Sequence, residues 1–233
     1  MSSLRRIVPT GCSSLDEQLG GGLSDGTIAL IYGEAETGKS TLGIQCAVNC
    51  ARMEYKTVFI DCDHTFSSRR MAQIAAEELE TLAPKIILMQ PEDFEQQTFV
   101  FDRLSEYISE KVGLIVVDTV TGLYRERLGN MKETFSLNRV LNRQMACLAQ
   151  ITKTRKVASL IISQVRSVVV EEHGLVEPVA RRILEFWADI TISLKPTAKT
   201  NIVRALVRTS MGKRPAKPVF LRIEESGLLD HRR

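Results

Sequence analysis

Apolar residues along the chain gather in short, almost continuous runs, and longer stretches with helical spacing separate them. Five runs predict strands buried on both faces: TIALIYG (27–33), KTVFIDCD (56–63), KIILMQ (85–90), LIVVDT (114–119) and VASLIISQ (157–164). Helices are expected between them: from about Lys39 to Met53, from Arg70 to Thr81, from Phe94 to Lys111, and along apolar positions from Phe135 to Ile151. Buried strands joined by helices are typical of a parallel sheet covered on both faces.

The last part of the chain has a different pattern, with strand-like segments joined by short turns. These segments are ADITISLKP (188–196), NIVRALVRTS (201–210) and KPVFLRIEE (217–225), with turns expected at Lys199-Thr200 and around Met211 to Pro215. Consecutive strands joined by short turns pair antiparallel. We therefore expect an α/β fold with a mostly parallel central sheet, flanked by helices, and an antiparallel C-terminal extension. No repeat or linker interrupts the pattern, so the sequence predicts one domain over 1–233.

One loop matches the phosphate-binding pattern G-x-x-x-x-G-K-[ST], directly after a predicted strand and before a predicted helix. Its glycines let successive backbone N–H groups turn toward phosphates, Lys39 reaches the β- and γ-phosphates, and the Ser40 hydroxyl ligates Mg²⁺. The start of the helix directs its positive end at the same anion. The residues expected to bind ATP are Gly33, Glu34, Ala35, Glu36, Thr37, Gly38, Lys39, Ser40 and Thr41.

Acidic residues follow two of the predicted strands. Asp118 ends LIVVD, which is where P-loop proteins hold Mg²⁺ directly or through water. Asp61 and Asp63, in FIDCDH, are candidates to polarise the attacking water. Alternation along a strand places both on one face, although strand ends often break that alternation. Both residues therefore stay candidates.

The net charge of the chain is small, but the charged residues are unevenly distributed along it. The 233 residues carry a net charge of +3, with 44% hydrophobic and 25% charged residues, as is ordinary for a globular protein. No apolar run reaches the roughly 18 residues of a membrane span, and MSSLRRIVPTG lacks the apolar part of a secretory signal. We expect a cytoplasmic protein with no membrane partner. From 195 to 233, however, ten basic residues stand against three acidic ones. Such a segment is either a solvated basic edge or a surface for a polyanion.

The five cysteines form an odd set without a CxxC pair: Cys12, Cys46, Cys50, Cys62 and Cys147. Two of them lie four residues apart in an apolar helical stretch, which predicts buried thiols on one helix face. No His or Cys lies at a spacing that suits a metal site. Buried cysteines in a reducing compartment are expected.

Taken in order, these motifs resemble the RecA/RadA recombinase family. PTGCSSLDEQLGGGLSDGTIALIYGEAETGKST is similar to the opening of that family's ATPase core, and FIDCDHTFSSRRM, LIVVDTVTGLYRERLG and LIISQV follow in the family's order. The similarity runs from about Val8 to Leu229 and is greatest to the short archaeal RadB branch. It implies a RecA-type P-loop ATPase core without the N-terminal helical DNA-binding domain of RadA. It also implies an accessory role in homologous recombination and repair, with DNA and a RadA-type recombinase as partners and a homo-oligomer as a further option.

Two positions of the family pattern bear on ATP hydrolysis. Asp63 stands where the family has its catalytic glutamate, and one methylene less moves the carboxylate back by about 1.5 Å. A misplacement of this order costs about 10²-fold in rate, so we expect a weak ATPase, with or without dependence on DNA. Gln164 matches the glutamine that senses the γ-phosphate and leads into a DNA-binding loop. The catalytic residues implied by the resemblance are Lys39, Asp63 and Gln164.

The resemblance also places two loops against DNA. The first follows DTVTGLYRERLG, so Arg125 and Arg127 are its expected phosphate contacts, whereas Tyr124 either stacks on a base or belongs to the core. The second, from about 166 to 182, carries Arg166 but also three glutamates, which weaken its case as a DNA contact.

A third basic element is the turn MGKRPAKP, where RadA-like proteins carry an acidic, proline-containing cap. Its expected DNA contacts are Lys213, Arg214 and Lys217. Contacts between such side chains and DNA phosphates predict binding that depends on salt concentration and not on base sequence. Single-stranded DNA is the expected preference.

Two alternatives to a recombination accessory stay open. A KaiC-like regulatory ATPase would act through protein partners without DNA. KaiC-type chains usually have paired glutamates after the strand that here ends in Asp61 and Asp63, so the acidic pair favours neither class, whereas DTVTGLYRERLG and the basic tail favour the recombinase branch. A scaffold that binds nucleotide only in order to fold is disfavoured, because Ser40 and Asp118 keep the chemistry of metal ligands.

Overall fold

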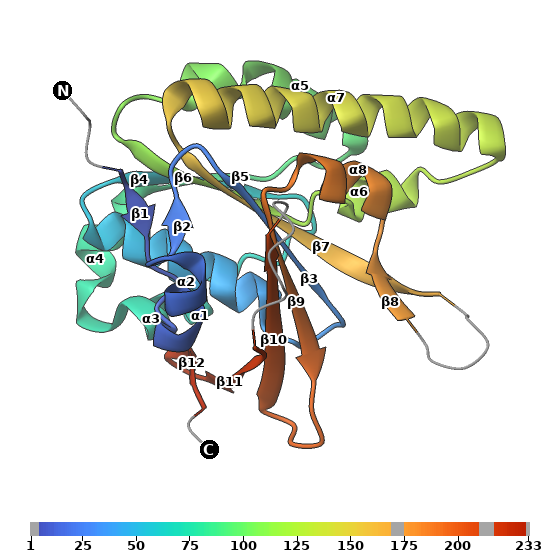
Figure 1. Cartoon of the computed structure of the whole chain (residues 1–233). Coiled ribbons are helices and arrows are strands. Elements are labelled where there is room, and N and C mark those ends of the chain that lie inside the picture. Colours follow the sequence, from blue (N-terminus) through green and yellow to red (C-terminus); the bar gives the residue numbers. More distant parts are fainter. Residues whose placement is uncertain (1–4, 169–174, 210–216, 232–233) are drawn as a thin grey trace.

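The computed structural model describes residues 5–168, 175–209 and 217–231, and for 166–168 and 175–178 it describes the backbone alone. A ten-stranded sheet runs through the described part in the order β12-β11-β10-β9-β3-β7-β6-β4-β5, with β8 paired to β7 (Figure 1). The strands expected as the parallel core are β3 (Ile28–Gly33), β4 (Lys56–Asp61), β5 (Ile86–Met89), β6 (Val112–Asp118) and β7 (Ala158–Val168). All five are present within a few residues of their predicted bounds.

The C-terminal strands extend this sheet as expected, with one refinement. They are β9 (Ile190–Pro196), β10 (Ile202–Thr209), β11 (Val219–Glu224) and β12 (Gly227–Asp230). Each pairs antiparallel with the next, but β9 also pairs parallel with β3. The change of direction therefore falls between β9 and β10. The turn predicted at Lys199-Thr200 is confirmed, and the turn predicted around 211–215 lies outside the described residues.

Helices cover both faces of the parallel strands (Figure 1). On one face lie α1 (Ser13–Leu19), α2 (Lys39–Arg52), α3 (Ser68–Ala75) and α4 (Leu79–Leu82), with short 3-10 turns η1 (Ala76–Glu78) and η2 (Ala83–Lys85). On the other face lie α5 (Phe94–Tyr107), α6 (Gly122–Glu126), α7 (Met131–Arg155) and α8 (Arg181–Trp187). Strand β6 is buried along its whole length between the two layers, which explains its unbroken apolar pattern.

Helix boundaries depart from the apolar pattern where local capping chemistry decides them. The helix predicted from Arg70 to Thr81 is interrupted at Ala76, whose φ of 51° is not helical. The long helix α7 starts at Met131, before the predicted Phe135, because Asn130 and Glu133 form a capping box with hydrogen bonds of 3.1 Å in both directions. Several short elements were not predicted: β1 (Ile7–Val8), β2 (Leu23–Ser24), β8 (Leu175–Pro178), β12, α1, α6 and α8.

Gln45, in the middle of α2, joins both ends of the chain to this helix. Its Nε2 donates to the carbonyl oxygens of Thr10 and Leu228 at 2.9 and 3.1 Å, and its Oε1 accepts from Leu228 N at 2.7 Å. Glycines make this approach possible, since a Cβ at Gly227 would overlap Gln45 Oε1 and one at Gly11 would come within 2.6 Å of Nε2. Because α2 starts at the phosphate loop, this junction also holds the loop in place.

The cysteines lie in the core, as expected. Four of the five thiols are buried and Cys147 is half-buried, and all five are free. Burial raises the pKa of Cys12 to about 12 and that of Cys50 to about 11, so these thiols stay protonated. Among the residues that the structure describes, none of the helices combines the length and apolar composition that crossing a bilayer requires.

Candidate functional site

The phosphate loop connects the end of β3 to the start of α2 and folds back on its own backbone. Thr37 Oγ1 and Lys39 Nζ both donate to the carbonyl oxygen of Glu34, at 2.8 and 2.6 Å. Glu36 and Gly38 have left-handed backbones, with φ of 61° and 84°. Such turns point successive N–H groups to one side and create a concave site for an anion.

Close packing around the loop explains its glycines. A Cβ at Gly33 would overlap the carbonyl oxygen of Leu194 in β9, and one at Gly38 would come within 3.0 Å of Leu228 in β12. Lys39 is almost fully buried, and this burial lowers the pKa of its ammonium group, while Asp118 and Asp63 oppose the shift. Ser40 and Thr41 lie half-buried in the first turn of α2. The loop residues predicted to bind ATP are therefore together in one nest.

Asp118, at the end of β6, is a buried carboxylate with the properties of a metal ligand. It is 1% exposed, and its Oδ1 has no hydrogen-bond partner within the described ranges. Burial raises the pKa of Asp118 to about 7, against the lowering effect of a hydrogen bond from the Ser40 side chain. An unpaired buried carboxylate oxygen beside a hydroxyl suits a hard cation such as Mg²⁺, which favours oxygen donors.

A protein cage for a metal is not found in the described residues. None of their His, Cys, Asp and Glu side chains form a group of three or more that could hold an ion. A Mg²⁺ ion that used Ser40 and Asp118 would need its other ligands from water and phosphate oxygens, as this ion usually does in nucleotide sites. The residues present fit that arrangement.

Asp61 and Asp63 are close in sequence but face different partners, because β4 ends at Asp61. Asp61 is fully buried and accepts hydrogen bonds from the backbone N–H groups of Thr65 and Phe66, each at 3.0 Å. It also accepts one from Gln90 Nε2 at 3.0 Å. Asp61 therefore shapes the loop after β4, and the strand alternation that would have grouped it with Asp63 does not continue past the strand end.

Asp63 lies beside the end of β6 and the middle of β7. Thr119 Oγ1 contacts its two oxygens at 3.1 and 3.0 Å, and Gln164 Nε2 donates to its Oδ2 at 2.7 Å. Burial raises the pKa of Asp63, while the hydrogen bonds from Thr119 and Gln164 and the charge of Arg125 lower it. Arg125 Nη1 in turn donates to Gln164 Oε1. Two predicted catalytic residues and one predicted DNA contact thus form one chain of hydrogen bonds.

The other arginine of the first predicted DNA loop is engaged elsewhere. Arg127 forms an ion pair with Glu95 of α5 at 2.6 Å, beside a cavity of about 780 Å³ between α5 and α7 that lies outside the phosphate loop. Tyr124 is buried and its hydroxyl donates to Asn138 of α7 at 2.9 Å, which makes it a core residue and not a base-stacking one.

The structure describes only some of the remaining predicted DNA contacts. Lys213 and Arg214 lie outside the described residues, as does the side chain of Arg166. Lys217 is exposed, and its carbonyl oxygen accepts a hydrogen bond of 2.6 Å from Gln18 in α1. The structure therefore brings Arg125 to the predicted catalytic residues, and leaves Lys217 on a separate edge beside α1.

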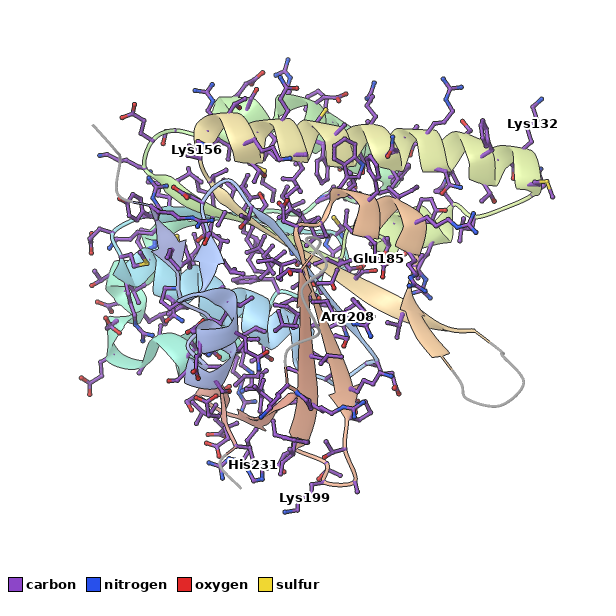
Figure 2. The ribbon with its side chains drawn as sticks, viewed as in Figure 1. Lys132, Lys156, Glu185, Lys199, Arg208 and His231 are labelled. Carbon is purple, nitrogen blue, oxygen red and sulfur yellow. The ribbon has the colours of Figure 1, made fainter. Side chains whose placement is uncertain are left out.

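A row of basic side chains on the outer face of β9 and β10 was not singled out from the sequence. Arg204 and Arg208 are exposed, while the alternate residues Val203 and Val207 are buried. Lys195 is the register partner of Arg204. Within the described ranges, none of these three side chains takes part in an ion pair. Figure 2 labels Arg208 on this strand and Lys199 at the hairpin tip. The sequence signal for this row was the spacing of Arg204 and Arg208, four residues apart in a predicted strand, which places both side chains on one face.

Exposed apolar side chains lie on the segments around the two predicted DNA loops. In the described part of the chain, seven large apolar side chains are exposed. Leu128 lies on the α6–α7 connection, Met131 and Phe135 lie in the first turns of α7, and Phe186 lies near the end of α8. Phe186 is 76% exposed and packs edge-on against Trp187. Exposed aromatic rings are surfaces on which unpaired bases can stack.

Comparisons with known proteins agree with this architecture. The Rad51 family model matches residues 3–231. The DNA repair and recombination protein RadB of Methanococcoides burtonii is 31% identical over 197 residues, which cover 84% of this chain and 86% of the relative. The protein of the same name from Methanothermobacter thermautotrophicus is 30% identical over 228 residues, which cover 96% of each chain.

A solved structure described as the RadB recombinase is similar over almost the whole chain. Its TM-score is 0.82 with 26% sequence identity, and the match covers 97% of this chain and 100% of the other. The likeness confirms the RecA-type core and the arrangement of strands expected from the sequence.

Proposed function

Because the chain belongs to the Rad51 family and, within it, to the RadB proteins, we propose that it is an ATP-binding accessory protein of DNA repair and homologous recombination. In this role it binds DNA and modulates a RadA-type recombinase, and it hydrolyses ATP weakly. The match over 3–231 supports treating residues 1–233 as one RecA-like ATPase domain.

The phosphate loop and Asp118 support the ATP-binding part of the proposal. Lys39 would exchange its bond with the Glu34 carbonyl for the β- and γ-phosphates, since both lie in the same concave loop. Ser40 and the unpaired Oδ1 of Asp118 would hold Mg²⁺, which when bound neutralises charge on the phosphates. Burial of these groups strengthens their electrostatic interactions with an anion.

The surroundings of Asp63 support slow hydrolysis. In this proposal Asp63 orients the attacking water molecule, but its oxygens already accept hydrogen bonds from Thr119 and Gln164. Gly122 packs against its Oδ1, so the side chain is held in position. A short carboxylate fixed in this way has little freedom to move toward a water.

The single observation that carries the DNA-binding part is the uncovered basic row of Lys195, Arg204 and Arg208. Its charges are not neutralised by ion pairs within the described residues. Lys195 and Arg204 are neighbours across the two strands, and a surface of one charge sign attracts a polyanion. The exposed apolar side chains beyond α6, together with Phe186, favour single-stranded DNA, because unpaired bases can stack on them.

An exposed sheet edge supports the protein-partner part of the proposal. Strand β5 lies at one end of the sheet, and its Leu88 is 40% exposed. An edge strand offers unpaired N–H and C=O groups to a strand from another chain. We propose that a RadA-type recombinase uses this edge, with a second copy of this chain as the competing occupant.

Fluorescence anisotropy with a labelled oligo(dT) tests the DNA-binding proposal. The native chain and Lys39→Ala are compared at low and high salt, with and without Mg-ATP. Binding that weakens with salt and responds to ATP only in the native chain would support the proposal. No binding to single- or double-stranded DNA at low salt would contradict it and favour a KaiC-like protein that acts through protein partners.

A further inference from the structure

The phosphate loop carries two acidic residues in the segment that turns around the anion. Glu34 and Glu36 are both exposed, and neither carboxylate forms an ion pair with any residue that the structure describes. Lys39 is the only basic residue between Gly33 and Thr41. Two negative charges therefore stand against one positive charge in a loop that has to bind a polyphosphate.

Glu36 adopts a backbone conformation in which a side chain is unfavourable. Its φ is 61°, in the left-handed region that glycine enters freely and that other residues enter at a cost. A glycine at this position would make the same turn without that cost. The geometry of the loop therefore does not require the carboxylate of Glu36, whose charge is a separate feature of the site.

The carboxylate of Glu36 stays close to any phosphate bound in the loop. The left-handed turns at Glu36 and Gly38 point successive N–H groups to one side, and a bound oxygen lies about 3 Å from such a donor. A glutamate carboxylate lies on the order of 4–5 Å from its own Cα, so every rotamer keeps it within about 10 Å of the nearest phosphate. This is about one Debye length at 0.1 M ionic strength, so salt screens the repulsion only in part.

Other carboxylates already surround the lysine of the loop. Burial lowers the pKa of Lys39, and the negative charges of Asp118, Asp63 and Glu34 oppose that shift. Several acidic groups around one ammonium group make this site unfavourable for a bare polyphosphate. A divalent cation on the phosphates removes about two of their negative charges, and so reduces the repulsion from each fixed carboxylate.

We propose that Glu36 is a specificity-determining residue of the phosphate loop, whose carboxylate makes the loop select nucleotide that carries Mg²⁺ over metal-free nucleotide. This inference rests on the proposed ATP binding. It assigns the steepness of the cation dependence to one side chain, and the same turn with a neutral residue would bind the two forms of the nucleotide more equally.

The test measures the Kd of N-methylanthraniloyl-ADP by fluorescence anisotropy at low salt, once with Mg²⁺ and once with EDTA. A diphosphate is used so that hydrolysis does not matter, and the ratio of the two Kd values reports the cation dependence. In Glu36→Gln, which keeps the turn and removes the charge, this ratio should fall by about 5-fold, mostly through tighter binding in EDTA. The difference from the native chain should shrink as salt is added, because screening weakens the repulsion.

Glu36→Gly separates the charge from the backbone strain. It removes the carboxylate and also relieves the left-handed position, so its Kd ratio should match that of Glu36→Gln. Its thermal midpoint without nucleotide should lie above that of Glu36→Gln, because only the glycine is free of strain there. The matched control is Glu17→Gln on α1, an exposed change that removes the same charge outside the loop and should keep the native ratio.

Three outcomes would overturn this role of Glu36: an unchanged ratio in Glu36→Gln, an equal fall in Glu17→Gln, or a fall in Glu36→Gly that Glu36→Gln does not share. The last result would assign the effect to the backbone and not to the charge. If the native chain with Mg²⁺ bound the nucleotide no better than Lys39→Ala, the proposed nucleotide site itself would be wrong, and the selection with it.

Discussion

Gly122 packs directly against the carboxylate of Asp63, and a Cβ at this glycine would overlap Asp63 Oδ1. Gly122 is the first residue of α6, and Asp63 occupies the position of the family's catalytic glutamate. Gly122 does not have a positive φ, so glycine is required here because a side chain would have no space.

The first prediction concerns this contact. In Gly122→Ala the carboxylate must move, and a displacement of about 1 Å can cost about 10²-fold in rate. Single-turnover ATP hydrolysis should therefore fall by about that factor, while nucleotide affinity, set by the phosphate loop, stays the same. Glu126→Ala, an exposed change in the same helix, is the control. Equal rates in native chain and Gly122→Ala would show that Asp63 takes no part in turnover.

The second prediction concerns pH. The pKa of Asp118 is about 7 in the folded chain against 3.8 for the unperturbed group, so between these values the folded state binds a proton that the unfolded chain has released. The free energy of unfolding of the nucleotide-free chain should then decrease as pH rises from about 4 to about 7, by at most about 4 kcal/mol, and level off above.

Asp118→Asn isolates this effect, because an amide keeps the shape of the side chain and does not titrate. Urea unfolding at several pH values in that window should give a shallower decrease for the variant than for the native chain. Parallel pH profiles would mean that Asp118 titrates near its ordinary pKa.

The third prediction concerns the basic row on β9 and β10. Arg204→Gln together with Arg208→Gln should weaken oligo(dT) binding and reduce the slope of log K against log salt by about 2, one for each lost phosphate contact. Both side chains are exposed, so the thermal midpoint should change little. The pair Arg103→Gln and Arg155→Gln, exposed on α5 and α7, removes the same charge from another surface. If both pairs change the slope equally, binding has no preferred face.

The fourth prediction concerns the junction at Gln45. In Gln45→Leu the N–H of Leu228 and the carbonyl of Thr10 lose the Gln45 side chain as their partner in a buried setting, while the carbonyl of Leu228 keeps the Cys12 thiol as a donor. Each buried orphan costs about 1–3 kcal/mol, so a loss of at least about 2 kcal/mol in unfolding free energy is expected. A thermal midpoint lower by roughly 4–8 °C would follow for a chain of this size.

Asn49→Ala provides the comparison for Gln45→Leu. Asn49 lies on the same helix; its side chain donates a hydrogen bond of 3.1 Å to the carbonyl of Pro9 and accepts an exposed one of 3.2 Å from Arg52. Its loss should cost about 1 kcal/mol. Similar midpoints for the two variants would show that the Gln45 junction is not a major source of stability.

Much of this protein could be predicted from local sequence alone. Buried strands such as β6 and the nest between Gly33 and Ser40 depend on side-chain types at fixed short spacings, so their patterns are visible without the fold. The antiparallel tail strands and the burial of Cys46 and Cys50 in α2 are of the same local kind.

Tertiary structure decided the relationships between distant residues. It separated Asp61 from Asp63, because one accepts bonds from its own loop and the other from β6 and β7. It joined Arg125 to Gln164, 39 residues away, and Gln45 to Leu228, 183 residues away. Lys195 and Arg204 became one basic row only through strand register. Local propensity carries no information on which chain segments meet, since that choice depends on burying two helix layers against one sheet.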